Sequence, residues 1–285
     1  MPDKPTTADG YGSEQVALVR PTCLYIATKL GDIMDELVVV GGLVPSLLIN
    51  QDSLPEGADA HVGTMDLDIG LTLTLLDNRR YKTLTERLRD SGFSEDINEE
   101  GNPTRQRWKI EREDKVTVTV DFLIQPSLPD DRGGQLRNIE SDFAAVIAPG
   151  LHLAFQDRER ISLSGRTVMG EQAAREVWVC GPGAYVVLKA LAFSLRGKNK
   201  DAYDLFYLVL NYGSGVEDVV SHLRPLLNDS STQEALNILR RDFLDAAGLG
   251  PRRVAEFIRG GPDEGIQADV MGYVRRLLEL CGFRG

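Results

Sequence analysis

Residues 64–71 constrain the fold of this chain more than any other stretch, because they read as a strand with two acidic residues on one face. Successive side chains of a strand point to opposite sides, so Leu67 and Ile69 share a face suited to a core. Asp66 and Asp68 share the other face, where their carboxylates repel each other. A cation between them relieves the repulsion, and oxygen ligands suit Mg²⁺. The alternative is a solvated strand face or a strand-end turn, because Asp-x-Asp is a common pattern.

A third aspartate, Asp121, lies on a strand predicted farther along the chain. Residues 104–110 and 115–124 read as a hairpin that turns at Glu113-Asp114. Alternation in its second strand puts Asp121 on the face opposite Val118 and Val120. A single aspartate in such a strand is usually a structural group. Together with the Asp-x-Asp pair it becomes a candidate metal ligand and base.

The first strand of this hairpin carries a basic stripe. Its members are Arg105, Arg107 and Lys109. Such a stripe usually faces solvent. Because it belongs to the same predicted sheet as the carboxylates, a phosphate-facing role is the alternative.

A glycine pair, Gly41-Gly42, follows a continuous apolar run at residues 37–40 that suits a buried strand. Residues 43–49 then predict a short helix. A strand, a glycine turn and a helix let backbone N–H groups approach an anion, and Ser46 would add a hydroxyl. A tight packing turn is the alternative reading.

Composition excludes several classes of protein. The 285 residues suit one large or two small domains, and no apolar run approaches the roughly 18 residues of a membrane helix. Three separated cysteines indicate reduced thiols in a cytosol, and three scattered histidines argue against zinc. The net charge of −11 argues against a protein that coats nucleic acid through its overall field.

The remaining pattern divides the chain into a leader (1–12), an α/β domain (13–180) and a helical domain (181–285). A helix is expected at 13–34, with Pro21 as a possible kink, and another from an N-cap at Asp77 to a C-terminal Gly92. Residues 51–63 and 126–137 read as loops, and residues 138–180 as short strands such as 161–163 and 177–179. Helices are expected at 184–197, 201–212, 216–227, 232–247, 251–259 and 266–281.

The helix expected at 184–197 carries Lys189 and Arg196 on one face. A basic turn with Lys198 and Lys200 follows, and Asp201 opens the next helix. Helix capping and dipole complementarity explain this aspartate fully, and a basic turn is usually solvated.

Taken together, these motifs resemble the nucleotidyltransferase fold of the DNA polymerase β superfamily. The run from Lys189 through Arg196 and Lys200 to Asp201-Ala-Tyr-Asp204-Leu is similar to the signature of AbiEii/AbiGii-type toxins of type IV toxin–antitoxin systems. The stretch from His61 to Asp68 is similar to that family's second motif. The resemblance covers roughly residues 37–210.

The resemblance implies a mixed α/β sheet with a helical C-terminal domain, and it implies roles for individual residues. Gly41 and Gly42 would cradle a triphosphate, while Asp66, Asp68 and Asp121 would hold two Mg²⁺ ions. Lys189 would contact nucleotide phosphates, and Asp201 matches the fourth-motif aspartate. Two departures exist: residues 51–63 look like an insertion, and Gly42 replaces a serine. Ser46 or Thr64 would then supply the hydroxyl.

The implied reaction is transfer of a nucleoside monophosphate from an NTP to a hydroxyl, here that of RNA and in particular the tRNA 3′ end. A cognate antitoxin is an implied partner and the cytoplasm the implied location. Alternatives are a nucleotidyltransferase acting on a small molecule or protein, and a degenerate binding module. Contacts to RNA or phosphate are expected from Arg105, Arg107, Lys109, Arg196, Lys198 and Lys200. Lys189→Met is expected to change stability by less than roughly 1 kcal/mol.

Overall fold

The computed structural model describes residues 4–72, 78–98, 100–111 and 117–283, which divide into two compact units. The sheet unit contains residues 12–44 and 63–180, and the helical unit contains residues 4–11, 45–62 and 181–283. The sequence predicted a single boundary at residue 180. In the structure, residues 4–11 and 45–62 also pack with the C-terminal helices.

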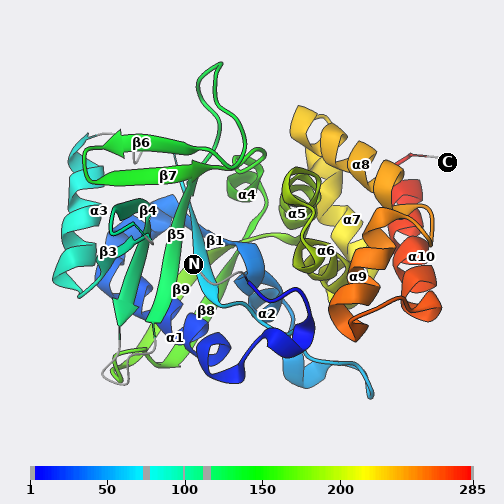
Figure 1. The fold of residues 1–285 in the computed structure, drawn as a ribbon, viewed down its shortest axis with the longest axis horizontal. Helices are drawn as coiled ribbons and strands as arrows, with labels where there is room; N and C mark the ends of the chain where they lie inside the picture. The colour runs from blue at the N-terminus through cyan, green and yellow to red at the C-terminus, as the bar shows by residue number, and fades with distance from the viewer. Residues whose placement is uncertain (1–3, 73–77, 99, 112–116, 284–285) are drawn as a thin grey trace. The chain divides into compact units, whose positions relative to one another are not determined.

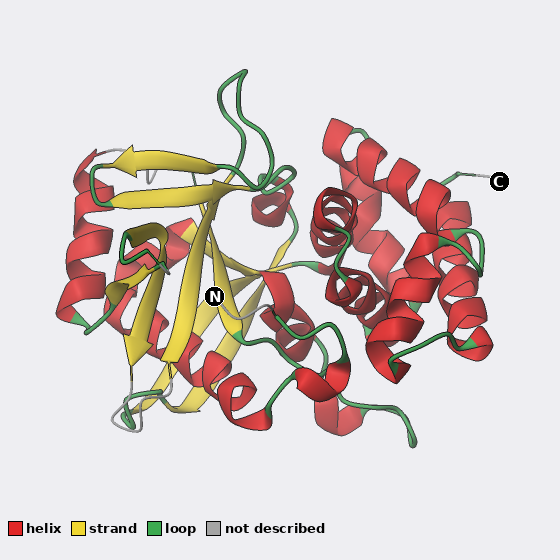
Figure 2. Ribbon diagram, in the orientation of Figure 1, coloured by secondary structure: helices red, strands yellow, loops and turns green. Residues whose placement is uncertain are grey.

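The sheet unit is built on a nine-stranded mixed sheet among the described residues (Figures 1 and 2). Its strands are β1 (Leu37–Val40), β2 (Asp66–Leu71), β3 (Ser94–Ile97), β4 (Pro103–Glu111), β5 (Thr117–Ile124), β6 (Leu136–Glu140), β7 (Phe143–Ile147), β8 (Arg158–Arg166) and β9 (Gln172–Cys180). The order is β3-β4-β5-β2-β1-β9-β8, and β7 joins β5 and β6. The predicted mixed α/β sheet followed by a helical C-terminal region is confirmed.

Strands β1 and β2 lie at the centre of this sheet, and their residues are almost entirely buried. They pair antiparallel, whereas β2 pairs parallel with β5 and β1 pairs parallel with β9. Leu67 and Ile69 are 0% and 1% exposed, which confirms the predicted core face of β2. Helix α1 (Ser13–Leu30) packs against β2, β5, β8 and β9. It continues through Pro21 and ends earlier than predicted, at a 3₁₀ helix over Gly31–Glu36.

The predicted hairpin is confirmed as β4 and β5, which pair antiparallel. Its predicted turn at Glu113-Asp114 and the predicted N-cap Asp77 lie outside the described residues. Helix α3 (Asn78–Asp90) ends just before Gly92, whose φ of 85° is the left-handed conformation expected there. The runs predicted as short strands after residue 157 belong to one long hairpin, β8 and β9. The short helix α4 (Leu153–Gln156) precedes it.

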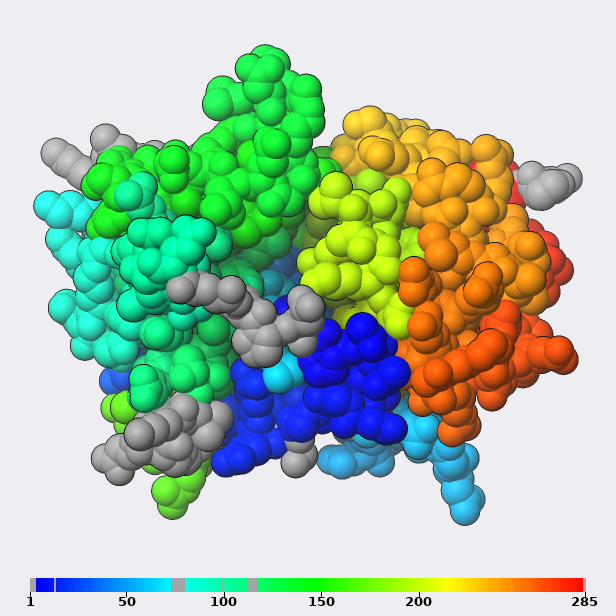
Figure 3. Space-filling model, viewed as in Figure 1, coloured from blue at the N-terminus to red at the C-terminus, as the bar shows by residue number. Residues whose placement is uncertain are grey.

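A long loop between β5 and β6 projects from the sheet unit (Figures 2 and 3). It begins after Ile124 and ends at Leu136, so the predicted loop over residues 126–137 is confirmed to within two residues. Asp131 fixes part of it by accepting hydrogen bonds from the backbone N–H groups of Ser127 and Leu128.

The helical unit consists of the six C-terminal helices and the two N-terminal segments packed with them. The helices are α5 (Pro182–Arg196), α6 (Asn199–Asn211), α7 (Val216–Leu223), α8 (Ser230–Phe243), α9 (Leu249–Arg259) and α10 (Glu264–Leu280), and α2 (Val44–Leu48) enters the unit at Pro45. A proline at the first turn and Gly197 (φ 60°) at the end bound α5. Among the residues predicted as a leader, Tyr11 packs edge-on against Phe257. Within the described ranges, no helix combines the length and apolar character that a bilayer span requires.

Candidate metal centre

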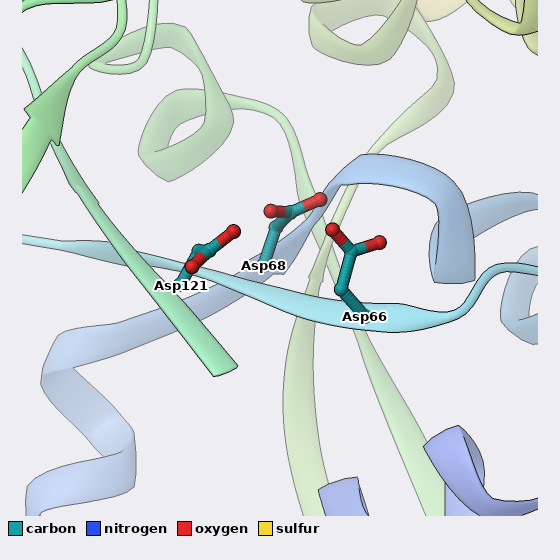
Figure 4. A group of neighbouring side chains, drawn as sticks. All are labelled: Asp66, Asp68 and Asp121. Atoms are coloured by element: carbon teal, nitrogen blue, oxygen red, sulfur yellow. The ribbon is translucent and has the colours of Figure 1, made fainter. Parts of the chain in front are cut away.

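Three aspartates meet on one face of the sheet unit, as the sequence predicted (Figure 4). The parallel pairing of β2 with β5 sets Asp68 directly opposite Asp121 and Asp66 opposite Thr119. Residues two apart on a strand share a face, so all three carboxylates lie on the same side. One oxygen from each lies within 4.8 Å of the others.

These carboxylates have little contact with water. Asp66 is 5% exposed and Asp121 is 9% exposed, while Asp68 is half-buried. Close negative charges in such an environment favour a cation between them, and hard oxygen donors are the ligands that Mg²⁺ takes. The donor set therefore fits a divalent cation. The Thr64 hydroxyl donates to Asp66 Oδ1 at 2.9 Å and orients that carboxylate.

Arg107 brings a positive charge to this centre. It lies opposite Asp121 in the β4–β5 ladder, and its guanidinium donates through Nε to Oδ1 at 2.5 Å and through a terminal nitrogen to Oδ2. Burial by itself would lower the pKa of Arg107. The hydrogen bonds and charge of Asp121, with the charges of Asp66 and Asp68, raise that pKa above its ordinary value. One carboxylate of the triad thus already has a cationic partner.

The predicted glycine turn borders the triad. Gly41 has a φ of 72°, and a Cβ at this position would lie 1.9 Å from Asp68 Oδ2. Backbone can approach the carboxylate this closely only without a side chain. Gly42 is buried beside it. Gly41 therefore gives Asp68 its room, a role that explains the residue before any ligand is considered.

The other members of the basic stripe do not share the environment of Arg107. Lys109 forms an ion pair with Asp96 at 3.3 Å, and Arg105 is exposed to solvent. Within the stripe, Arg107 therefore binds the triad, Lys109 pairs with Asp96, and Arg105 faces solvent. A phosphate-facing role for it stays a prediction.

The predicted residues of the helical unit form a second cluster. Lys189 Nζ lies 3.3 Å from Asp201 Oδ1 and 2.8 Å from Asp204 Oδ2, and its side chain is only 8% exposed. Arg196 Nε also donates to Asp201, at 2.7 Å, and Lys200 Nζ donates to Asp204 at 2.5 Å. Lys189 and Lys200 are therefore ion-pair partners with little exposure, whereas the sequence suggested that the turn containing Lys200 faces solvent. Lys198 is exposed.

His61 completes this cluster. The sequence analysis named it only as the first residue of a motif and predicted no role for it. Its Nε2 lies 2.9 Å from Asp204 Oδ1, and its Nδ1 lies 3.1 Å from the Ser46 hydroxyl. Its ring stacks on Tyr203 with centroids 5.5 Å apart. The predicted nucleotide ligand Ser46 thus makes its hydrogen bond within the helical unit. No local signal links His61 to a helix so distant in sequence.

Ser46, His61 and Asp204 are hydrogen-bonded in the serine–imidazole–carboxylate order of a catalytic triad. The pKa of His61 opposes such a role. Burial, followed by the nearby charges of Lys200 and Lys189, lowers the pKa of His61 to about 4, against the hydrogen bond and charge of Asp204. A general base that works near neutrality needs a higher pKa. Since carboxylate oxygens only accept, neutral His61 donates from Nε2 to Asp204 and accepts the Ser46 proton at Nδ1. These hydrogen bonds therefore have a structural role rather than a catalytic one.

Comparisons with known proteins place the chain in no family. No protein-family model matches the sequence, and no curated protein matches it. A crystal structure of an antigenic nucleotidyltransferase-like protein from Paracoccidioides brasiliensis is similar in part. It is 16% identical, the match covers 78% of this chain and 87% of that chain, and the TM-score is 0.41. So weak a likeness carries no inference about activity, and the acidic triad has to be interpreted by itself.

Proposed function

We propose that this chain is a cytosolic, Mg²⁺-dependent nucleotidyltransferase that moves a nucleoside monophosphate from an NTP to a hydroxyl of RNA. One observation carries the proposal: Asp66, Asp68 and Asp121 converge within 4.8 Å on adjacent strands of a mixed sheet. Phosphoryl chemistry needs little covalent help from a protein and depends on positioning and charge, which such a centre supplies.

In the proposed reaction the acceptor oxygen bonds to the α-phosphorus, and the bond from that phosphorus to the bridging oxygen breaks. Pyrophosphate leaves, and the hydroxyl proton passes to a carboxylate or to water. A divalent cation, when bound, neutralises charge on the phosphates and lowers the pKa of the acceptor hydroxyl. Asp66 and Asp68 would hold that ion, Thr64 fixes the orientation of Asp66, and the missing side chain of Gly41 leaves room for the Asp68 carboxylate.

Two proposed roles belong to the helical unit and are independent of the triad's geometry. Lys189 is proposed to act on nucleotide phosphates and Asp201 to support it, as the AbiEii/AbiGii resemblance implies. Lys189 already bridges two aspartates, so its ammonium would keep those ion pairs while acting on a ligand. The same resemblance underlies our proposal that the enzyme is a toxin with a cognate antitoxin and that the tRNA 3′ end is its acceptor.

The choice of RNA as acceptor rests on exposed cationic side chains. Arg105 and Lys198 are exposed, and half of the Arg196 side chain is exposed. Backbone contacts through such groups make binding salt-dependent, with a slope of about 0.7–0.9 per phosphate neutralised. The net charge of −11 favours the second candidate, a small-molecule or protein acceptor, which would show little salt dependence.

The test is incubation of the purified chain with total bacterial RNA, Mg²⁺ and each labelled NTP in turn, at low and at higher salt. We expect labelled RNA of tRNA size from the wild-type chain and none from Asp68→Asn. The matched control is Asp96→Asn, which removes a carboxylate at the sheet edge and should label RNA normally. Label entering a small molecule or protein supports the second candidate. Absence of Asp68-dependent label in any acceptor refutes the proposed activity.

A further inference from the structure

Asp121 is bound by a guanidinium from the neighbouring strand. The Arg107 guanidinium binds both of its oxygens through two parallel hydrogen bonds, and the two residues are register partners on adjacent strands. Their side chains are 14% and 12% exposed, so water competes weakly for either partner. Paired, charge-assisted hydrogen bonds of this kind are both strong and directional.

The combined charge of the centre also favours a single divalent cation. Three carboxylates and one guanidinium carry a combined charge of −2, which one divalent cation neutralises. A cation that also used Asp121 would have to lie beside the guanidinium, at the cost of repulsion between like charges. Asp66 and Asp68 lie two residues apart on one face of β2.

We propose that Arg107 withholds Asp121 from the first divalent cation, so that Asp66 and Asp68 alone supply the carboxylates for that ion. Asp121 becomes a ligand only when Arg107 leaves it, and Arg107 thereby controls how many ions the centre binds. This inference rests on the metal dependence in the proposed function and identifies a residue that regulates it.

Removing only one member of the pair changes the charge of the centre, whereas removing both members keeps it. Arg107→Gln removes the bidentate partner of Asp121, so the charges of the three carboxylates are no longer offset by the guanidinium. The repulsion between a unit charge and a divalent ion about 4 Å apart in water then disappears, so the ion should bind about thirtyfold more tightly or a second ion should bind. The double variant Arg107→Gln/Asp121→Asn keeps the combined charge and has no third carboxylate to offer.

The experiment is calorimetric titration of the full chain with Mn²⁺ in the absence of nucleotide, at pH 7.5. We expect one ion for the wild-type chain, an affinity within about threefold of wild type for the double variant, and about thirtyfold tighter binding for Arg107→Gln. Asp66→Asn should lose the ion. The matched control is Lys109→Gln/Asp96→Asn, which removes the neighbouring ion pair between β4 and β3 and should bind Mn²⁺ as wild type does.

Two results overturn the inference. Loss of the ion in Arg107→Gln/Asp121→Asn as severe as in Asp66→Asn would make Asp121 a ligand of the first ion. Unchanged affinity and stoichiometry in Arg107→Gln would show that the guanidinium withholds nothing. If Arg107→Gln fails to fold, the charge-balanced double variant still decides the question. A wild-type chain that binds no Mn²⁺ refutes the metal dependence of the proposed function as well, so the two failures are distinguishable.

Discussion

Replacing Lys189 with Met tests whether the buried ion pairs of the helical unit stabilise the fold. Lys189 reaches Asp201 and Asp204 at 3.3 and 2.8 Å, and the two carboxylate side chains are 3% and 1% exposed. Burial alone would raise the pKa of Asp204. The charges of Lys189 and Lys200, with the His61 hydrogen bond, lower it below its ordinary range, so Asp204 stays ionised in the core. Methionine keeps the apolar stem of Lys189 but deletes the ammonium.

The expected loss follows from what remains after the substitution. Removing one partner of a buried ion pair typically costs about 3–5 kcal/mol, because a buried charge loses its compensation. Here Asp201 keeps Arg196 at 2.7 Å and Asp204 keeps Lys200 at 2.5 Å. We therefore expect the free energy of unfolding to decrease by about 3 kcal/mol, the lower end of this range. The smaller value expected from the sequence treated Lys189 as exposed, and its burial makes that premise wrong.

Urea unfolding of the full chain at pH 7.5 measures this loss, with amide hydrogen exchange in α5 and α6 assigning the transition to the helical unit. A chain of two compact units need not unfold in one step, so the assignment is necessary. The matched control is Lys198→Met, an exposed lysine at the N-cap of α6, which should change stability by less than about 0.5 kcal/mol. A Lys189→Met chain as stable as this control would refute the argument that the ion pairs stabilise the core.

Two further predictions concern pH and the glycine turn. The pKa of His61 is about 4 in the fold and 6.5 ordinarily, so between these pH values the unfolded chain binds a proton that the folded chain does not. The free energy of unfolding should fall as the pH drops from 7 to 4, by up to about 3 kcal/mol from this residue, and urea midpoints for His61→Gln should show a flatter profile. Gly41→Ala places a methyl group on the Asp68 carboxylate and strains a φ of 72°. It should weaken Mn²⁺ binding by about tenfold or more in calorimetry, whereas Gly57→Ala, also at positive φ but with open space, should leave the affinity unchanged.

The alternation of side chains along strands was enough to predict the core of the metal centre. Period-two patterning put Asp66 and Asp68 on the face opposite Leu67 and Ile69, and the same rule oriented Asp121 in its hairpin. The apolar run before Gly41 predicted a buried strand, because only a fully covered strand has no polar face. Local patterns of this kind survive folding, since the backbone geometry that produces them is set within a few residues.

The partners of the charged side chains were decided by tertiary structure. Nothing near Arg107 in sequence predicts its bond to Asp121, which depends on the register of β4 against β5. Lys189, Asp204 and His61 come from three segments, and only the packing of residues 45–62 with the helices removes them from water together. Charge pairing depends on three-dimensional distance and on the exclusion of solvent, and neither quantity is a property of a local stretch of sequence.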